Sequence, residues 1–344
     1  AIPTILAKAS DNPYILQAPE YRQHYAANDN IRFAVIGMGI MGFNNCRTAT
    51  QVPGTELAAV CDLYDGRLEH AKEVFGKDIM TTKDYREVLE RDDIDAVFVA
   101  TTDHWHDHMT KAALKAGKHV YCEKPMVHHI DEGLSVIEAE KASGKVLQVG
   151  SQRVSSIMYE KAKELFEQDI IGKLIMVETY NDRQSALGAW QYSIPTDASP
   201  KTVDWDAYLG DAPKVPYDNN RFFRWRNYQD YGTGIAGDLF VHLFSGLHTV
   251  TGALGPERIF ATGGLRYWKD GRDVPDLMLG LYDYPETENH PAFNLQMRVN
   301  FIDGNGGGSL LRLVGTEGTM EINWGTITVT RNPMSENPGY GGWD

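Results

Sequence analysis

The chain has 344 residues, 47 aspartates and glutamates against 33 lysines and arginines, and a formal net charge of −14. This length exceeds what one hydrophobic core usually serves, so we expect two domains. An acidic chain without a basic block repels nucleic acid and anionic lipid. The sequence also contains no run of 18 apolar residues, the length that a membrane-spanning helix needs. We therefore expect neither nucleic acid nor membrane as a partner.

Residues 1–30 are polar and rich in Asn, Asp and Ala, without an apolar period. We interpret them as an arm before the first domain. The sequence starts at Ala1 rather than Met, which fits a removed signal peptide, a trimmed chain or ordinary loss of the initiator Met.

From residue 31 to 152, apolar runs typical of buried strands alternate with segments of helical period. This alternation predicts a doubly wound, parallel sheet, a Rossmann-type dinucleotide-binding domain. The predicted strands are 31–37, 56–62, 95–101, 118–122 and 146–150, and the predicted helices are 41–51, 66–75, 83–91, 105–116 and 131–143.

Residues 153–344 have a different pattern, in which strand-like runs follow one another without intervening helices. Consecutive strands joined by turn residues favour an α+β domain with a large open, mostly antiparallel sheet. The expected elements are helices 156–168 and 237–251, an irregular aromatic-rich stretch 181–231, and strands 174–180, 259–267, 276–284, 293–302, 309–315, 320–323 and 327–331.

Gly37, Gly39 and Gly42 form G-x-G-x-x-G directly after the first predicted strand and at the start of a helix. The glycines suit a tight turn, close approach of the backbone to a pyrophosphate, and contact between helix and strand. Asp62 ends the second strand, 20 residues after the last glycine. A carboxylate there accepts hydrogen bonds from a ribose diol and repels a 2′-phosphate, so we expect NAD, with NADP less favoured. Arg67 is read as a solvated helix cation.

Lys124 lies in Cys-Glu-Lys-Pro-Met, just after the predicted strand 118–122. Most lysines in such a place are simply solvated. However, ligands of open α/β sheets bind at the carboxyl ends of the strands, so Lys124 is a candidate catalytic residue.

Asp238 and His242 are four residues apart on a strongly apolar predicted helix, so they share one face. A buried aspartate and histidine need polar partners. Taken alone, Asp238 is more often an acid that interacts with the helix dipole, and His242 is more often a core histidine with a hydrogen-bond partner. Together with the glycine loop and Lys124, they become candidate catalytic residues.

The run from Asp103 to His108 contains three histidines, which raises the question of a metal. It lies at a strand-to-helix turn, where alternate histidines point in different directions, and it has neither thiolate partners nor an HExxH pattern, so we predict no metal site. The three cysteines, Cys46, Cys61 and Cys122, form no CxxC motif, so a thiolate zinc site or a redox pair is not expected. We expect them to pack as small apolar residues in the core.

The aromatic-rich stretch carries side chains that suit a sugar, whose C–H faces stack on rings and whose hydroxyls bond arginines. Core and loop packing is the competing interpretation, so contact with substrate stays open. The residues are Trp190, Tyr192, Trp205, Trp225 and Tyr228 with Arg183, Arg221, Arg224 and Arg226.

Together these motifs resemble the glucose–fructose oxidoreductase/inositol dehydrogenase (Gfo/Idh/MocA) family over about residues 31–330. The resemblance rests on GMGIMG at 37–42, TTDHWH at 101–106, the triplet 123–125, and the glycine-rich lead into Asp238 and His242. It implies a Rossmann domain, an open α/β domain whose sheet makes a dimer or tetramer, and catalytic roles for Lys124, Asp238 and His242. Trp225-Arg226 resembles the family's Trp-Arg pair near the cofactor.

The candidate ligand contacts follow from the motifs and from this resemblance. The cofactor contacts are Gly37, Met38, Gly39, Ile40, Met41, Gly42, Asp62, Thr101, Thr102, His106, Glu123, Lys124, Trp225 and Arg226, and the substrate contacts are Lys124, Arg153, Arg183 and His242.

The sequence departs from the family pattern in two places. The usual T-P-N turn reads Thr101-Thr102-Asp103, and the chain stops at GGWD where family members usually continue into helices, so we expect a truncated or divergent end. The N-terminal arm resembles that of exported members, which favours an exported location.

We expect reversible oxidation of a secondary hydroxyl of a sugar, sugar derivative or polyol, with hydride transfer to NAD(P). His242 would act as general base, Lys124 would hold the oxygen, and Asp238 would fix the tautomer of His242. The alternative is an NAD-dependent glycoside hydrolase or lyase acting through transient oxidation at C3. A non-catalytic NAD-binding sensor is less favoured, because it leaves Asp238 and His242 without a purpose.

Overall fold

The computed structural model describes residues 30–333 and the backbone of residues 5–8. Contacts along the backbone divide the chain into two compact units. One contains residues 30–150 and Trp190–Gly237, and the other contains Ser151–Ala189, residues 238–333 and the strand at residues 5–8. Most of the predicted arm and the final GGWD lie outside the described residues.

The first unit contains a parallel sheet of six strands, in which the strand order reverses around β2. Because β2 has β3 on one side and β5 on the other, the loop that follows β2 lies at a topological switch point, where open α/β sheets bind ligands. In spatial order the strands are β4 (Met80–Thr82), β3 (Thr55–Cys61), β2 (Ile31–Ile36), β5 (Ala96–Val99), β6 (His119–Glu123) and β7 (Leu147–Gly150).

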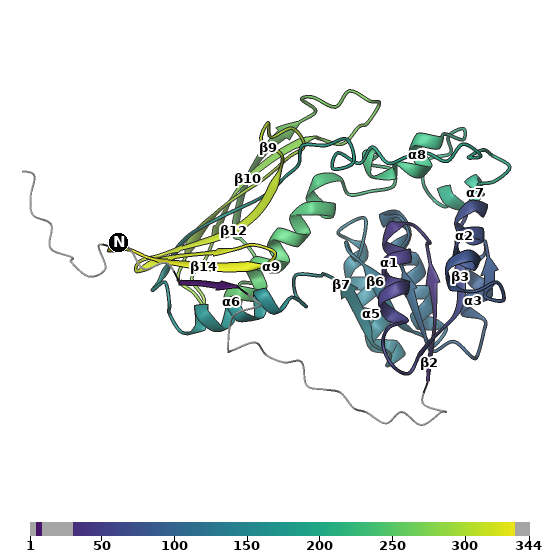
Figure 1. Cartoon of the computed structure of the whole chain (residues 1–344), viewed down its shortest axis with the longest axis horizontal. Helices are drawn as coiled ribbons and strands as arrows, with labels where there is room; N and C mark the ends of the chain where they lie inside the picture. The colour runs from purple at the N-terminus through teal and green to yellow at the C-terminus, as the bar shows by residue number, and fades with distance from the viewer. Residues whose placement is uncertain (1–4, 9–29, 334–344) are drawn as a thin grey trace, which may run out of the picture. The chain divides into compact units, whose positions relative to one another are not determined.

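Two apolar cores lie on opposite faces of this sheet, because successive side chains of β2 alternate between them. Phe33 and Val35 pack with residues of α1 and α2, whereas Ala34 and Ile36 belong to the core that contains residues of α3 and α4. Helices on both faces confirm the predicted doubly wound architecture (Figure 1). The helices are α1 (Ile40–Ala49), α2 (Asp65–Phe75), α3 (Tyr85–Leu89), α4 (His106–Lys115) and α5 (Glu132–Ser143).

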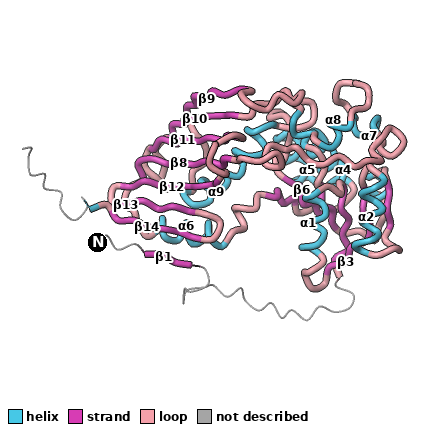
Figure 2. The backbone as a smooth tube through the Cα atoms, turned by 45° about the horizontal axis from the view of Figure 1, so that its top comes forward, coloured by secondary structure: helices cyan, strands magenta, loops and turns pink. Residues whose placement is uncertain are grey.

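The second unit is built on an eight-stranded sheet, visible as a row of strands in Figure 2. Its strands pair antiparallel except for β8 with β11, so the predicted mostly antiparallel sheet is confirmed. Helices α6 (Ile157–Glu167) and α9 (Val241–Thr251) pack against it. In spatial order the strands are β1 (Ile5–Lys8), β14 (Thr326–Arg331), β13 (Gly318–Ile322), β12 (Gly308–Gly315), β8 (Leu174–Asp182), β11 (Phe293–Asn300), β10 (Leu277–Tyr284) and β9 (Arg258–Gly264).

Residues 190–237 group with the parallel sheet, although the prediction placed them in a continuous domain 153–344. They contain α7 (Trp205–Leu209) and α8 (Asn219–Phe223) within the stretch that we expected to be irregular. The physical reason for the grouping is an aromatic cluster that joins Tyr64, after β3, to Trp205, Phe223 and their neighbours.

The sequence pattern does not predict two short strands, β1 and β4. β1 lies inside the segment 1–30 that was interpreted as an arm and pairs with β14, and β4 extends the parallel sheet beside β3. Strands of three or four residues are held by main-chain hydrogen bonds and are too short to show a period of two. The interpretation of residues 1–30 as an arm therefore did not anticipate the strand at residues 5–8.

Candidate dinucleotide and catalytic site

The three glycines of the loop after β2 meet three different steric conditions. Gly37 has a φ of +93°, and a Cβ there would lie 2.5 Å from the carbonyl oxygen of Ala100. A Cβ on Gly42 would lie 1.9 Å from the carbonyl oxygen of Gly37, so the start of α1 packs directly on the loop. Gly39 has no atom within 4 Å of its Cβ position. That open side is where a pyrophosphate could approach the backbone.

The other loop residues differ in exposure. Met38 is fully buried and belongs to the core between the sheet, α1 and α2, whereas Ile40 is 60% exposed at the first turn of α1. Met41 is half-buried. Met38 can therefore offer a cofactor mainly its backbone, whereas Ile40 can offer an apolar side chain.

Asp62 fixes the end of β3 to the glycine loop. Its Oδ2 accepts a hydrogen bond of 2.7 Å from the backbone N–H of Met38, and its Oδ1 accepts one of 2.9 Å from the N–H of Tyr64. Arg67 lies on the outer side, with Nη1 3.4 Å from both oxygens. The two backbone N–H groups and the two Arg67 contacts occupy about four acceptor positions, so a ribose diol would bond Asp62 in place of the longer Arg67 contacts.

Lys124 directly follows β6, and its side chain is half-buried. The preceding Glu123 is 4% exposed and accepts a hydrogen bond of 2.8 Å from Asn45 on α1. This bond ties the end of β6 to the helix that begins at the glycine loop. The Lys124–Pro125 peptide is cis.

The turn after β5 is held by its own polar side chains. The hydroxyl of Thr102 lies 3.0 Å from Nδ1 of His104, and Asp103 accepts hydrogen bonds from the N–H and the hydroxyl of Thr233 at 2.9 and 2.8 Å. Thr101 is half-buried, with its hydroxyl 3.3 Å from the carbonyl oxygen of Thr102. Asp103 thereby anchors residues 190–237 at this turn.

His106 has a different position from the predicted one beside a nicotinamide. It is 1% exposed, with Nδ1 2.6 Å from the carbonyl oxygen of Pro125 and Nε2 3.3 Å from that of Thr101. Because both ring nitrogens face backbone oxygens, the imidazole has no atom left for direct contact with a cofactor.

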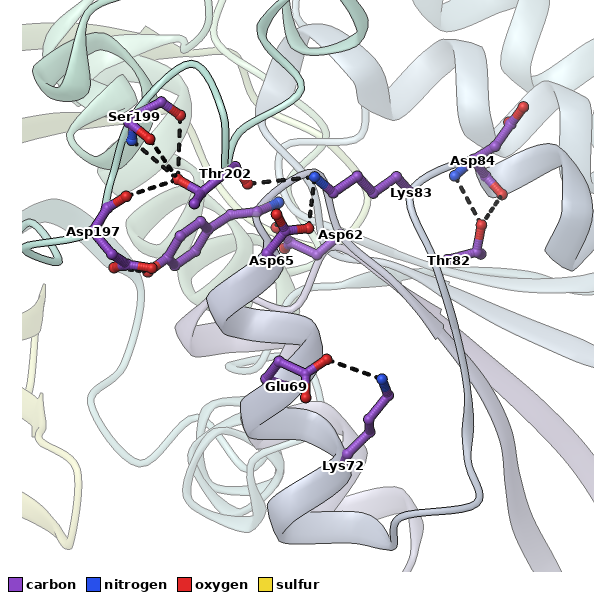
Figure 3. Close-up of polar contacts among 11 residues, drawn as sticks. Asp62, Asp65, Glu69, Lys72, Thr82, Lys83, Asp84, Asp197, Ser199 and Thr202 are labelled. Atoms are coloured by element: carbon purple, nitrogen blue, oxygen red, sulfur yellow. Dashed lines mark hydrogen bonds and ion pairs between the residues drawn. The ribbon is translucent and has the colours of Figure 1, made fainter.

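A second anchor holds residues 190–237 at the end of β3, as Figure 3 shows. Lys83 forms a 2.6 Å ion pair with Asp65 and bonds the carbonyl oxygen of Thr202, and the hydroxyl of Tyr64 donates to Asp197 at 2.5 Å. Burial, and then the Asp197 carboxylate, raise the pKa of the Tyr64 phenol, which keeps it a hydrogen-bond donor.

Most aromatic and arginine side chains of this segment serve the fold. Trp190 and Trp205 are buried, and Arg221 bonds Asp230 at 2.8 Å. Arg224 donates to Gln191 at 2.6 Å and to the carbonyl oxygen of Tyr192. In the Trp225-Arg226 pair, the guanidinium lies 4.1 Å from the indole centroid.

The second unit carries Asp238 and His242. The predicted single helix begins as a π-helical turn, Ala236–Phe240, which contains Asp238, and continues as α9, which contains His242. Asp238 is 5% exposed, whereas His242 is half-buried. Single π turns occur often at functional sites.

Arg153 and Arg183 also lie in the second unit. Arg153 is 2% exposed, donates to the hydroxyl of Ser309 at 2.9 Å and packs between the rings of Tyr159 and Trp324. Burial lowers the pKa of Arg153, and Tyr159 partly offsets that effect. Arg183 donates to the carbonyl oxygen of Gly188 at 2.9 Å. Both side chains therefore have structural contacts, and substrate binding by them stays a prediction.

Sequence reasoning missed the residues that support the loops: Asn45, Asp103 as the acceptor for Thr233, and Tyr64. No motif marks them, since their partners lie 78 to 133 residues away in the sequence. Among the described residues, no group of three or more His, Cys, Asp and Glu side chains could hold a metal ion.

No helix in the described part of the chain is long and apolar enough to cross a membrane. The exported location expected from the N-terminal arm stays a prediction.

Residues 31–151 match the family model GFO_IDH_MocA, described as an oxidoreductase family with an NAD-binding Rossmann fold. Inositol 2-dehydrogenase of Salmonella typhimurium is 31% identical over 149 residues, which cover 43% of this chain and 44% of the relative. The scyllo-inositol 2-dehydrogenase (NAD(+)) of Bacillus subtilis is 33% identical over 157 residues, 45% of this chain and 46% of the relative. The chain thus matches less than half the length of these two relatives.

Among solved structures, myo-inositol 2-dehydrogenase from Lactobacillus plantarum superimposes with a TM-score of 0.65. The match covers 85% of this chain and 76% of that one at 21% identity, so it concerns the fold of both units. The glycine loop and Asp62 both lie within the segment that matches the NAD-binding family model. Residues 31–151 are thus similar to the NAD-binding Rossmann domain of the Gfo/Idh/MocA oxidoreductase family.

Proposed function

We propose that this protein is an NAD-dependent dehydrogenase that oxidises a secondary hydroxyl of a sugar or polyol. The observation that carries the proposal is the match of residues 31–151 to an NAD-binding oxidoreductase family, in which the glycine loop and Asp62 have the geometry that a dinucleotide needs. The relatives that act on inositols support a cyclic polyol as the first substrate to test.

Asp62 supports NAD over NADP. A 2′-phosphate on the ribose would approach a carboxylate that is already fixed by two backbone N–H groups and cannot rotate away. Arg67 does not offer a free site for that phosphate, because its guanidinium is shared between Asp62 and the rings of Phe222 and Phe223. The negative charges of the Asp62 carboxylate and of a 2′-phosphate would repel each other, which disfavours NADP.

In the proposed reaction, Lys124 holds the substrate oxygen and stabilises negative charge as the hydroxyl proton leaves. His242 accepts that proton, since an imidazole with a pKa near neutrality can both take and return it. Asp238, one helical turn before His242, sets its tautomer. NAD, when bound, supplies the hydride acceptor.

The test is a screen of polyols and sugars with NAD, followed by variants. Lys124→Ala and His242→Ala should each lower kcat at least ~100-fold with little change in NAD affinity. Lys115→Ala, a change of an exposed lysine at the end of α4, is the matched control and should retain activity. Near-normal turnover in both catalytic variants would remove the assignment.

The same preparation separates this function from an NAD-dependent glycoside hydrolase. Release of nitrophenol from nitrophenyl glycosides, without net formation of NADH, is the result expected of a hydrolase and contradicts the dehydrogenase proposal. Tight NAD binding without turnover of any polyol contradicts both enzymatic functions.

We further propose a homo-oligomer through the outer face of the eight-stranded sheet. Phe260 and Leu281 are paired across β9 and β10 and are 58% and 57% exposed, and Ile175 on β8 is 51% exposed. On the same face, Arg312 bonds Glu178 and lies 3.4 Å from Glu321, so these charges are matched within one chain. The face is apolar along β9 and β10, and the charges beside this apolar part are paired within one chain. Such a face can pack against the same face of a second copy.

A further inference from the structure

Two histidines of the turn after β5 have opposite hydrogen-bonding environments. Nε2 of His104 lies 3.0 Å from the carbonyl oxygen of Tyr208, and its Nδ1 lies 3.0 Å from the hydroxyl of Thr102. A hydroxyl can donate a hydrogen bond, so a neutral imidazole with its proton on Nε2 satisfies both contacts. Burial lowers the pKa of His104 to about 4, in agreement with a neutral ring.

His106 faces two carbonyl oxygens and also bonds the side chain of Cys122. Nδ1 lies 2.6 Å from the carbonyl oxygen of Pro125, and Nε2 lies 3.3 Å from that of Thr101. A neutral imidazole has a single N–H, so its other nitrogen would direct a lone pair at a carbonyl oxygen. The ring is 1% exposed, so bulk water does not relieve that repulsion. An imidazolium, with two N–H donors, bonds both carbonyl oxygens at once.

The titratable groups that face this ring favour the same state. They are Asp103 and His104 from the turn Asp103–Trp105, and Cys122 from β6. Burial by itself lowers the pKa of His106, but Cys122, Asp103 and the carbonyl of Pro125 outweigh it and raise the pKa to about 9. His104 is neutral and does not oppose the charge.

The two carbonyl groups belong to neighbouring loops at the ligand-binding edge of the sheet. Thr101 follows β5, whereas Pro125 follows Lys124 after β6, and β5 pairs in parallel with β6. The ring of His106 therefore bridges the loop of the Thr-Thr-Asp turn and the loop that carries Lys124. Asn45 bonds Glu123, the last residue of β6 before that loop.

We propose that His106 is a positioning residue, which as a buried imidazolium clamps these two loops together and fixes the backbone that carries Lys124. It contacts neither cofactor nor substrate. Its protonation is independent of the reaction, whereas its effect on turnover rests on the proposed function of Lys124.

The sign of the pH effect follows from the raised pKa. The clamp is complete below the ordinary histidine pKa of 6.5 and is lost as the pH rises through about 9, where one of the two N–H donors disappears. Turnover should therefore fall on the alkaline side as the loop loosens, and the folded state should lose stability over the same interval.

The first test measures protonation directly by ¹⁵N NMR of the histidine side chains in the full chain, with His106→Gln used to assign the signal. We expect both ring nitrogens of His106 to carry protons at pH 7 and one proton to leave near pH 9. A ring with one unprotonated nitrogen at pH 7 overturns the proposal, whether or not the protein turns over a polyol.

The second test measures the consequence for turnover. His106→Gln removes the double donor and should lower kcat at least ~10-fold while the KM for NAD changes less than ~3-fold. The alkaline decline of kcat near pH 9 should also disappear. His70→Gln on α2 is the control, since that ring is half exposed, pairs with Glu73 of its own helix and packs against Phe43, away from the His106 contacts.

The outcomes separate the two proposals. An inactive wild-type protein whose His106 is an imidazolium contradicts the proposed function and leaves the clamp in place. An active protein in which His106→Gln keeps both kcat and the alkaline profile contradicts the clamp alone. If His106→Gln does not fold, the NMR measurement on the wild-type protein still decides the protonation state.

Discussion

Replacing Gly39 by alanine should leave the fold nearly unchanged and weaken NAD binding, whereas Gly42→Ala should destabilise the fold. Gly39 has φ −79° and ψ −166°, which any residue adopts, and no atom lies within 4 Å of its Cβ position. An alanine there loses the small N-cap advantage of glycine and gains unfolded-state entropy, so the net change is about 0.5 kcal/mol or less. At Gly42 the new Cβ would lie 1.9 Å from a backbone oxygen.

That contact at Gly42 cannot be relieved by a side-chain rotation, because the oxygen belongs to Gly37 in the same tight loop. Forcing a methyl group into such a site costs at least ~2 kcal/mol. For Gly39, the methyl group instead fills the open side of the loop where the pyrophosphate would lie. We expect NAD affinity to fall at least tenfold, which corresponds to ~1.4 kcal/mol.

Urea unfolding measures the stability of both variants, and calorimetric titration measures their affinity for NAD. Gly255→Ala is the control, because its Cβ also meets nothing within 4 Å and it lies outside the dinucleotide loop. Two results would refute the reasoning: a Gly39→Ala variant that binds NAD as well as the wild type, or a Gly42→Ala variant as stable as the control.

Three further predictions test other parts of the molecule. Asp62→Ala leaves two N–H groups without their acceptor and should cost ~3 kcal/mol in urea unfolding, against less than ~1 kcal/mol for the exposed Asp65→Ala. Because burial lowers the pKa of His104 to about 4, the protein should lose ~3 kcal/mol of stability from pH 6.5 to 4, and His104→Gln should reduce this acid sensitivity in pH-dependent unfolding. Leu281→Glu should shift the proposed homo-oligomer toward monomers in analytical ultracentrifugation, without unfolding the chain.

The sequence predicts the parallel sheet well because its signals are local. The strands that carry the fold are continuous apolar runs, and β2 and β3 each end in four consecutive buried residues, as expected for strands covered on both faces. The glycine loop is likewise recognisable, since three glycines at fixed spacing follow a strand. Its steric reasons, however, appear only when Gly42 is seen against the carbonyl of Gly37.

The placement of residues 190–237 could not be predicted, because their contacts are distant in the sequence. Tyr64 bonds Asp197, and Asp103 bonds Thr233 130 residues later, so no local period reports either contact. The aromatic residues of this stretch fit a sugar-binding surface equally well by composition. Their burial against Tyr64 shows that Trp205 and Phe223 instead attach the segment to the parallel-sheet unit.

His104 and His106 mark the limit of residue-type reasoning at the candidate site. Both stand in the same turn and, as residue types, carry the same ligand chemistry. Their charges differ because one ring meets a hydroxyl that can donate and the other meets two carbonyl oxygens that cannot. The charge at this site is thus set by which backbone oxygens the fold brings to the ring.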